Sequence, residues 1–181
     1  MKTELSIETK LDIAKKEILI SSSEINHRVL KLGQEISTDY QGRELHLVGV
    51  LNGAFIFLAD LVRQIKIPCQ ICFLQASSYK DQKVSSGEVT LMNNLDLRGK
   101  DVLVVEDIFD SGLTLECVLE DLMKQNPNSL EACSLLNKNV PNKAPVTVKY
   151  IGFDIEDRFV VGYGLDFAEK YREVPHILCL D

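Results

Sequence analysis

The chain of 181 residues is long enough for one domain with its own hydrophobic core. Hydrophobic residues make up 45% of it and charged residues 26%, as in ordinary soluble globular proteins. The formal net charge of −7 argues against nucleic acid as the main partner, because phosphate backbones are bound mostly by clustered Lys and Arg. A small phosphorylated ligand is compatible with this charge, since backbone amides, a few cations and a metal ion can hold an anion.

The sequence carries no sign of export or membrane insertion. The N-terminal segment mixes acidic residues with lysines, unlike a signal or transit peptide. The longest uncharged run, Leu45 to Ala59, is short for a membrane span. We therefore expect a cytoplasmic protein with no membrane partner. The five cysteines are expected to be reduced. Cys69 and Cys72 have the spacing of redox and zinc sites, but they lie in an apolar, strand-like run that no second Cys or His pair complements.

The first half of the chain predicts a helix, a strand, a helix and a strand. A serine-rich helix start at 21–23 precedes apolar residues at helical spacing up to residue 36. Leu45–Leu51 is a continuous apolar run, which is typical of a buried parallel strand. After a turn at Asn52-Gly53, residues 54–65 are expected to form a helix that stops before a proline. A second strand is expected over Ile71–Leu74.

The second half repeats this alternation after a long polar stretch. Ser77 to Glu88 predicts a flexible loop of the kind that often closes over a site. Asp101–Val105 is the clearest buried strand, and Leu115–Lys124 should be helical. Further strands are expected at 133–136, 146–153 and 160–161. The alternation predicts an α/β fold with a mostly parallel twisted sheet flanked by helices, in which ligands bind at the carboxyl ends of the strands.

The segment Val104–Leu115 combines a hydrophobic strand, acidic residues and a short loop that opens a helix. Gly112 lets the backbone take a positive φ and approach a ligand closely. The backbone N–H groups from Ser111 to Thr114 can point into one concavity at a helix N-terminus, which is a suitable cradle for phosphate. Neither a classical P-loop nor a Rossmann glycine pattern occurs in the chain.

The acidic residues before this loop allow two interpretations. Glu106 and Asp107 stand where carboxylates could bind sugar hydroxyls, directly or through Mg²⁺. Alternatively, Asp110 or Ser111 is only a helix cap and the preceding acids face solvent. Three carboxylates so close together would repel one another, and a cation or a hydroxyl-rich ligand would relieve that repulsion. We therefore favour the binding site.

The run Glu106–Thr114, after a strand of valines, resembles the phosphoribosyl pyrophosphate signature of type I phosphoribosyltransferases. The similarity extends from about Ile25 to Leu180, and its later part resembles the hypoxanthine-guanine phosphoribosyltransferases. Further matching segments are the pyrophosphate loop Val50–Phe55, the start of the mobile catalytic loop Ser77–Tyr79, the purine-binding segments Leu136–Lys138 and Asp157–Asp166, and the basic position Tyr171-Arg172.

The resemblance implies a single domain over residues 1–181, with a core of about 40–150 and a small hood subdomain from about 1–35 and 150–181. It implies a purine salvage enzyme that transfers the phosphoribosyl group from phosphoribosyl pyrophosphate to hypoxanthine or guanine. The products would be IMP or GMP and pyrophosphate, and the cofactor would be Mg²⁺. Members of the family usually form dimers or tetramers, so we also expect a homo-oligomer.

The resemblance also implies roles for individual residues. Asp110 is the general base that interacts with purine N7. Lys138 donates to the exocyclic O6 and so selects 6-oxopurines over adenine. Phe159 stacks on the purine, and the Val160 backbone reads its edge. The other implied roles are 5′-phosphate binding by Ser111, Gly112, Leu113 and Thr114, ribose and metal binding by Glu106 and Asp107, a second Mg²⁺ at Asp166, pyrophosphate binding by Leu51, Asn52, Gly53 and Arg172, and closure over the reacting centre by Ser78 and Tyr79.

Two positions depart from the family pattern. Many members carry Lys or Arg where this chain has Asn52, and some carry Lys where it has Leu113. Both departures indicate that the protein attracts phosphate more weakly, or that Mg²⁺ contributes a larger part of phosphate binding. The resemblance further implies a cis peptide bond between Leu51 and Asn52.

The alternatives differ in class. Without the resemblance, Lys138 would be a solvated lysine, Phe159 a core residue, and Asp166 with Arg172 an exposed ion pair. The same fold could also serve a phosphoribosyl pyrophosphate sensor that regulates transcription by binding nucleic acid, although the acidic charge argues against it. A third alternative is an enzyme of the xanthine-guanine type.

Overall fold

The computed structural model describes residues 13, 15–76, 89–91 and 96–180. The predicted lid of Ser77 to Glu88, with the candidate residues Ser78 and Tyr79, lies outside the described residues. The main element is a six-stranded sheet with strand order β4-β3-β2-β5-β6-β7. Five of its strands run parallel, and the short edge strand β4 is antiparallel to β3. The strands are β2 (Leu45–Leu51), β3 (Cys69–Ala76), β4 (Val89–Leu91), β5 (Asp101–Phe109), β6 (Ser129–Lys138) and β7 (Tyr150–Ile155).

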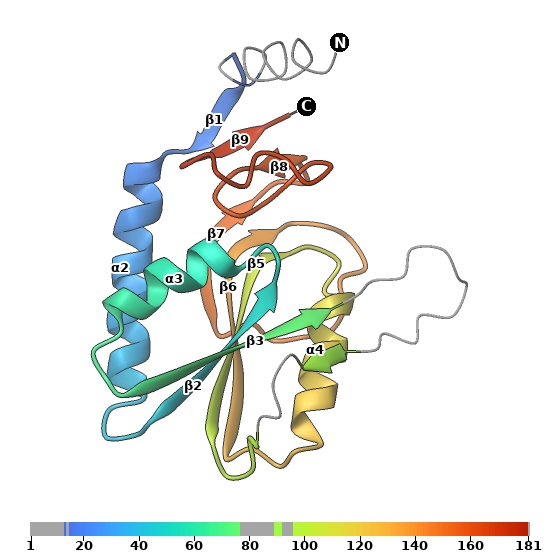
Figure 1. Cartoon of the computed structure of the whole chain (residues 1–181). Coiled ribbons are helices and arrows are strands. Elements are labelled where there is room, and N and C mark those ends of the chain that lie inside the picture. The colour runs from blue at the N-terminus through green and yellow to red at the C-terminus, as the bar shows by residue number, and fades with distance from the viewer. Residues whose placement is uncertain (1–12, 14, 77–88, 92–95, 181) are drawn as a thin grey trace, which may run out of the picture.

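Helices cover both faces of this sheet (Figure 1). The helices α2 (Ser22–Asp39) and α3 (Phe55–Gln64) lie on one side, and α4 (Leu113–Met123) lies on the other. Strand β5 shows why both faces are apolar. Its residues Leu103 and Val105 belong to the core under α2 and α3, whereas Val102 and Val104 belong to the core under α4. Successive side chains of a strand point to opposite faces, so a continuous apolar run needs cover on both sides. The predicted fold class is confirmed.

The helices begin and pack as their local sequence dictates. Ser21 caps α2 through a capping box, in which its Oγ accepts from the Glu24 N–H and the Glu24 carboxylate accepts from the Ser21 N–H. The predicted helix start is therefore confirmed. A Cβ added at Gly33 would lie 2.4 Å from Cβ of Gln64, so glycine allows α2 to approach the end of α3 closely.

A second, three-stranded sheet joins the two ends of the described chain. It consists of β1 (Glu17–Ile20), β9 (Ile177–Cys179) and β8 (Val160–Val161) in the order β1-β9-β8, with antiparallel pairing. Figure 1 shows it beyond the end of the large sheet, next to α2 and β7. Sequence patterns predicted β8 but neither β1 nor β9. The division into a core and a hood with the expected boundaries stays a prediction.

Several element boundaries differ from the prediction, and β3 and β6 both extend beyond the expected ranges 71–74 and 133–136. Strand β5 runs on to Phe109, so the candidate acids Glu106 and Asp107 belong to the strand and not to the loop after it. The last strand of the large sheet begins at Tyr150 and not at Val146. The segment before it is a loop whose valines pack against the core under α4, and this explains its strand-like alternation of apolar residues. In the part of the chain that the structure describes, no helix is long and apolar enough to cross a membrane.

Candidate active site

Three parallel strands end at the same edge of the large sheet: β2 at Leu51, β5 at Phe109 and β6 at Lys138. The loops that follow them carry most of the candidate residues. Because the carboxyl ends of neighbouring parallel strands meet at one edge, the topology brings these distant segments together.

The cysteines take no part in a disulfide: Cys72, Cys133 and Cys179 are buried free thiols, and Cys69 and Cys117 are partly buried.

The loop after β5 has the shape expected of a phosphate cradle. Gly112 takes a left-handed conformation with φ of 82° at the N-cap of α4. A Cβ at this position would lie 2.6 Å from Cε2 of Phe109, so both the conformation and the space require glycine. The first amides of α4 have no partner within the helix, and they point out of its N-terminus. The loop is held from behind, since the Ser111 carbonyl accepts from the N–H of Ala144 at 2.8 Å.

Glu106 and Asp107 form a buried acidic pair at the end of β5. Their relative exposures are only 9% and 8%, so they do not simply face solvent. The Ile108 N–H donates to Asp107 Oδ1 at 3.0 Å, whereas Glu106 Oε2 is buried with no hydrogen-bond partner among the described residues. Burial raises the pKa of Glu106 well above its ordinary value, and the neighbouring Asp107 adds to this. Burial likewise raises the pKa of Asp107 to about 6.

Mg²⁺ fits this acidic pair. The ion prefers oxygen ligands and is usually held by one or two carboxylates together with water and substrate oxygens. The unpartnered Glu106 Oε2 supplies such an oxygen, and a cation would relieve the repulsion in the pair. Within the described ranges, no group of three or more His, Cys, Asp or Glu side chains could hold a metal ion by itself. Asp166 therefore does not join Glu106 and Asp107 in one three-ligand site, and the predicted second Mg²⁺ at Asp166 would need ligands from substrate.

The loop after β2 packs directly on the acidic pair. The Leu51–Asn52 peptide bond is cis, as the resemblance implied. A Cβ added at Gly53 would lie 1.7 Å from Oδ2 of Asp107, so only glycine fits here. A Cβ added at Gly164 would in turn lie 2.2 Å from the Gly53 carbonyl oxygen. Segments far apart in the sequence thus meet in van der Waals contact.

Arg172 links this stack of loops to Asp166. Its Nη1 donates to the Gly164 carbonyl at 2.7 Å, and its Nη2 pairs with Asp166 Oδ1 at 2.9 Å. Asp166 Oδ2 also accepts from the N–H of Glu169. The positive charge of Arg172 lowers the pKa of Asp107, although burial outweighs it. Arg172 and Asp166 are therefore an ion pair, but a partly buried one placed at the candidate site.

Of the candidate base-reading residues, Lys138 lies at the end of β6, whereas Phe159 lies just before β8. Nζ of Lys138 is 3.2 Å from Asp110 Oδ2 and 3.3 Å from Asp157 Oδ1, and its side chain is only 11% exposed. The alternative of a solvated lysine is wrong. The interpretation of Phe159 as a core residue is also wrong, because it is 48% exposed and meets Phe167 edge to face with ring centroids 5.6 Å apart.

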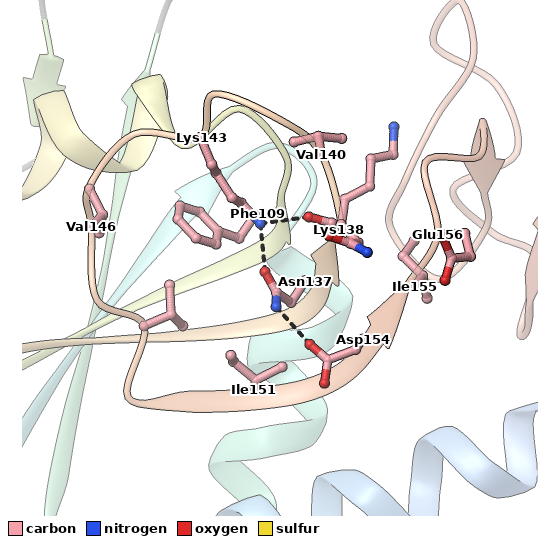
Figure 2. Close-up of a pocket in the computed structure, with 12 residues that line it drawn as sticks. Phe109, Asn137, Lys138, Val140, Lys143, Val146, Ile151, Asp154, Ile155 and Glu156 are labelled. Atoms are coloured by element: carbon pink, nitrogen blue, oxygen red, sulfur yellow. Dashed lines mark hydrogen bonds between the residues drawn. The ribbon is translucent and has the colours of Figure 1, made fainter.

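Three side chains near the site escaped the sequence analysis. Asp157 begins a segment that matched the family, and its position there could have singled it out. Phe167 follows the candidate Asp166 directly and packs on Phe159. Lys143 belongs to the loop after β6 and lines a pocket of about 480 Å³ together with Phe109 and Lys138 (Figure 2). No local spacing marked this lysine.

Comparison with known proteins agrees with the geometry. The family described as phosphoribosyl transferase domain matches residues 21–168. A curated hypoxanthine-guanine phosphoribosyltransferase from Dictyostelium discoideum is 47% identical over 168 residues, which cover 90% of this chain and 93% of that protein. The chain belongs to the hypoxanthine-guanine phosphoribosyltransferase family.

Further relatives support this membership. The hypoxanthine phosphoribosyltransferase of Escherichia coli strain K12 is 44% identical over 165 residues, covering 89% of this chain and 93% of the relative. A crystal structure of a hypoxanthine-guanine phosphoribosyltransferase from Bacillus anthracis has a TM-score of 0.85 at 42% identity, covering 92% of this chain and 99% of that one. The phosphoribosyltransferase fold is thus present nearly from end to end.

Proposed function

We propose that this protein salvages purines by transferring the phosphoribosyl group of phosphoribosyl pyrophosphate to hypoxanthine or guanine, which yields IMP or GMP and pyrophosphate. The observation that carries the proposal is the ion pair of Lys138 and Asp110, since it places a cation and a carboxylate side by side next to the phosphate cradle. A 6-oxopurine offers the matching pair of groups, an oxygen at position 6 and a titratable nitrogen at position 7. The names of the relatives support the same activity.

Phosphoribosyl pyrophosphate fits along the edge of the sheet. The amides of Ser111–Thr114, with the Thr114 hydroxyl, bind its 5′-phosphate. Glu106 and Asp107 hold the ribose hydroxyls and Mg²⁺, which would neutralise charge on the leaving pyrophosphate when bound. The loop Leu51, Asn52 and Gly53 and the guanidinium of Arg172 bind the pyrophosphate oxygens. Asn52 supplies no positive charge, so we expect Arg172 and the metal to bear a larger share of this binding.

The purine binds on the other side of the anomeric carbon. Lys138 donates to O6, Phe159 stacks on the ring, and the Val160 backbone reads its edge. As N9 bonds to the anomeric carbon, the bond from that carbon to pyrophosphate breaks and pyrophosphate leaves with the electron pair. Asp110 takes the proton that the purine loses at N7. Adenine carries an amino group at position 6, which would bring one donor against the Lys138 ammonium, another donor, and adenine is therefore rejected.

A panel of bases tests this proposal. Hypoxanthine, guanine, xanthine and adenine are each incubated with phosphoribosyl pyrophosphate and Mg²⁺, and pyrophosphate release is measured. We expect turnover with hypoxanthine or guanine and none with adenine. Preferred turnover of xanthine would favour the xanthine-guanine type, and binding of phosphoribosyl pyrophosphate without turnover of any base would favour the sensor. Chelation of the metal should abolish turnover, and added Mg²⁺ should restore it; metal-independent catalysis would contradict the roles of the acidic pair.

The remaining assignments are proposals of the same kind. Ser78 and Tyr79 would close over the reacting centre and exclude water, which would otherwise capture the sugar cation. Asp166 would hold a second Mg²⁺. We also propose a homo-oligomer, a dimer or a tetramer, in the cytoplasm, and a core with a hood formed by the chain ends. Size-exclusion chromatography with light scattering measures the oligomeric state directly.

A further inference from the structure

Lys143 occupies a central place behind the candidate site. Its Nζ donates to Asn137 Oδ1 at 2.6 Å and to the Lys138 carbonyl at 2.7 Å, as the dashed lines in Figure 2 show. The same ammonium lies 3.9 Å from the centroid of the Phe109 ring, within the range of a cation–π contact. One cation therefore contacts the ends of two neighbouring strands.

The two strands stop pairing at this point. The last residues in register between β5 and β6 are Phe109 and Asn137, and Lys143 contacts both side chains. The residues that follow these two in the chain are Asp110 and Lys138, on which the proposed recognition of the base depends. Beyond the last rung of the ladder, no sheet hydrogen bond between β5 and β6 sets their separation. Besides the direct ion pair of Lys138 and Asp110, the contacts of Lys143 join the two strand ends at this point.

A second hydrogen bond fixes the side chain of Asn137, whose Oδ1 accepts from Lys143. Asn137 Nδ2 donates to Asp154 Oδ1 at 2.6 Å, and Asp154 is the register partner of Asn137 on β7. An ionised carboxylate only accepts hydrogen bonds, so Asp154 orients the amide with its oxygen towards Lys143. Burial lowers the pKa of Lys143, and the charges of Asp110 and Asp154 oppose this.

We propose that Lys143 is a positioning residue for the transfer reaction, which holds Lys138 and Asp110 at the separation that a 6-oxopurine requires. The inference rests on the proposed function, because it assigns the base to these two residues. A backbone hydrogen bond, from the Ala144 N–H to the Ser111 carbonyl, attaches the phosphate cradle to the loop after β6. This bond does not need the ammonium group of Lys143. Loss of the Lys143 charge should therefore disturb the base more than phosphoribosyl pyrophosphate.

The first test is Lys143→Met, which keeps the length of the side chain and removes its charge. We expect kcat/KM for hypoxanthine to fall by about 10- to 100-fold, since small misplacements of reacting groups cost this much. KM for phosphoribosyl pyrophosphate should change by less than about threefold, because its predicted ligands lie on other loops. A variant that loses thermal stability but keeps wild-type kinetics would overturn the inference, since Lys143 would then act only in folding.

Lys149→Met is the matched control. Lys149 lies before β7 after the same loop and makes comparable contacts, with its Nζ 5.6 Å from the Tyr40 ring centroid and 3.3 Å from Asp39 Oδ2. None of these partners belongs to the candidate site, so kinetics should be those of the wild type. Equal kinetic losses in both variants would overturn the inference.

A double-mutant cycle tests whether Lys143 acts through Lys138. In the background of Lys138→Ala, the substitution Lys143→Met should lower kcat/KM by a clearly smaller factor than in the wild type. Full additivity would overturn the mechanism. If Lys143→Met does not fold, Asp154→Ala serves instead, because Asp154 is exposed and alanine removes the acceptor that orients the Asn137 amide. This variant should lower kcat/KM for hypoxanthine as well, and wild-type kinetics in Asp154→Ala would overturn the inference.

The wild type in the same assay separates this inference from the proposed function. Absence of purine transfer by the wild type would refute the function itself. Normal transfer by the wild type with unchanged kinetics in Lys143→Met would refute only the positioning role.

Discussion

Gly53 sets the distance between the loop Val50–Phe55 and the acidic pair. The Cβ of any other residue would lie 1.7 Å from Asp107 Oδ2, which is far inside van der Waals contact. Asp107 has no room to retreat, because its side chain is buried beside Glu106. A substitution at Gly53 must therefore move either the loop or the carboxylate.

Gly53→Ala should lower kcat/KM for phosphoribosyl pyrophosphate by about 100-fold, as expected for a displacement of about 1 Å in a reactive site. Steady-state kinetics with saturating hypoxanthine measure the effect, and KM for Mg²⁺ should rise in parallel. Gly42→Ala is the control, because a Cβ there meets nothing within 4 Å and only the positive φ is strained. That variant should lose some thermal stability and keep its kinetics. Wild-type kinetics in Gly53→Ala would show that the position of Asp107 does not matter for the reaction.

Asp110 and Asp157 share the ammonium of Lys138, yet we expect different consequences of neutralising them. Asp110→Asn should lower kcat by about 10²- to 10⁴-fold, the usual contribution of a positioned base. Binding of phosphoribosyl pyrophosphate, measured by calorimetry, should change little. Asp157→Asn should mainly raise KM for hypoxanthine, because Asp157 holds Lys138 without reaching the proposed proton. Wild-type turnover in Asp110→Asn would remove Asp110 from the mechanism.

The candidate residues that the sequence analysis singled out lie in continuous motifs. The run from Glu106 to Thr114 is readable because strand, acids, glycine and helix start follow one another. Lys143 and Phe167 have no such context, since their contacts form only when distant strands meet. The same holds for the clash that excludes a side chain at Gly53, because Asp107 is far away in the sequence.

At the scale of elements, the loop between β8 and β9 docks on α3 and on the loop Val50–Phe55. Tyr163 is buried in this loop, and its hydroxyl donates to Asp60 Oδ2 on α3 at 2.5 Å. The next residue, Gly164, packs against the Gly53 carbonyl and accepts from Arg172. The bond between Tyr163 and Asp60 thus anchors the segment that carries the predicted pyrophosphate ligand.

Tyr163→Phe keeps the packed ring and removes this anchor. A hydrogen bond to a charged group contributes about 1.5–3 kcal/mol, so the free energy of unfolding should fall by roughly that amount. KM for phosphoribosyl pyrophosphate should rise severalfold because Arg172 is held less firmly. Tyr150→Phe is the matched control: it removes a bond of the same kind, to Asp39 on α2, away from the site. If both variants lose stability and both keep the wild-type KM for phosphoribosyl pyrophosphate, the docking role is refuted.

The elements that the sequence predicted share a strong local pattern. β2 is apolar except for His46, β5 is apolar from Val102 to Val105, and α2 has a capping box. β1 and β9 have only 4 and 3 residues, and β1 finds its partner, β9, only at the other end of the chain. For the segment before β7, the sequence pattern predicted a strand that the structure does not have. Its valines alternate as in a strand, but they serve the core under α4.

At the scale of the whole molecule, stability depends on two cores separated by the sheet. Buried polar residues are few among the described residues, and His46 on β2 is one of them. It is 4% exposed, and its Nδ1 is buried without a hydrogen-bond partner among the described residues. Burial lowers the pKa of His46, and the charge of Lys100 lowers it further, while Glu44 and Asp101 oppose this. The folded protein therefore resists protonation of His46.

This resistance makes stability depend on pH in a defined direction. The unfolded chain binds a proton at His46 below a pKa of about 6.5, whereas the folded chain binds it only at lower pH. Between these two values the unfolded state holds more protons, so the free energy of unfolding should fall as the pH falls, by at most about 1.4 kcal/mol per pH unit. Above the unfolded pKa, His46 is neutral in both states and contributes no such dependence.

His46→Leu should remove this part of the pH dependence, because leucine does not titrate. Urea denaturation at intervals from pH 7.5 to pH 5.0 gives the free energy of unfolding of the variant and the wild type, and the difference between the two curves isolates His46 from the carboxylates that titrate in the same range. His27→Gln is the control, since His27 is an exposed residue of α2, and it should follow the wild-type curve. Parallel curves for His46→Leu and the wild type would show that the buried histidine does not control stability in acid.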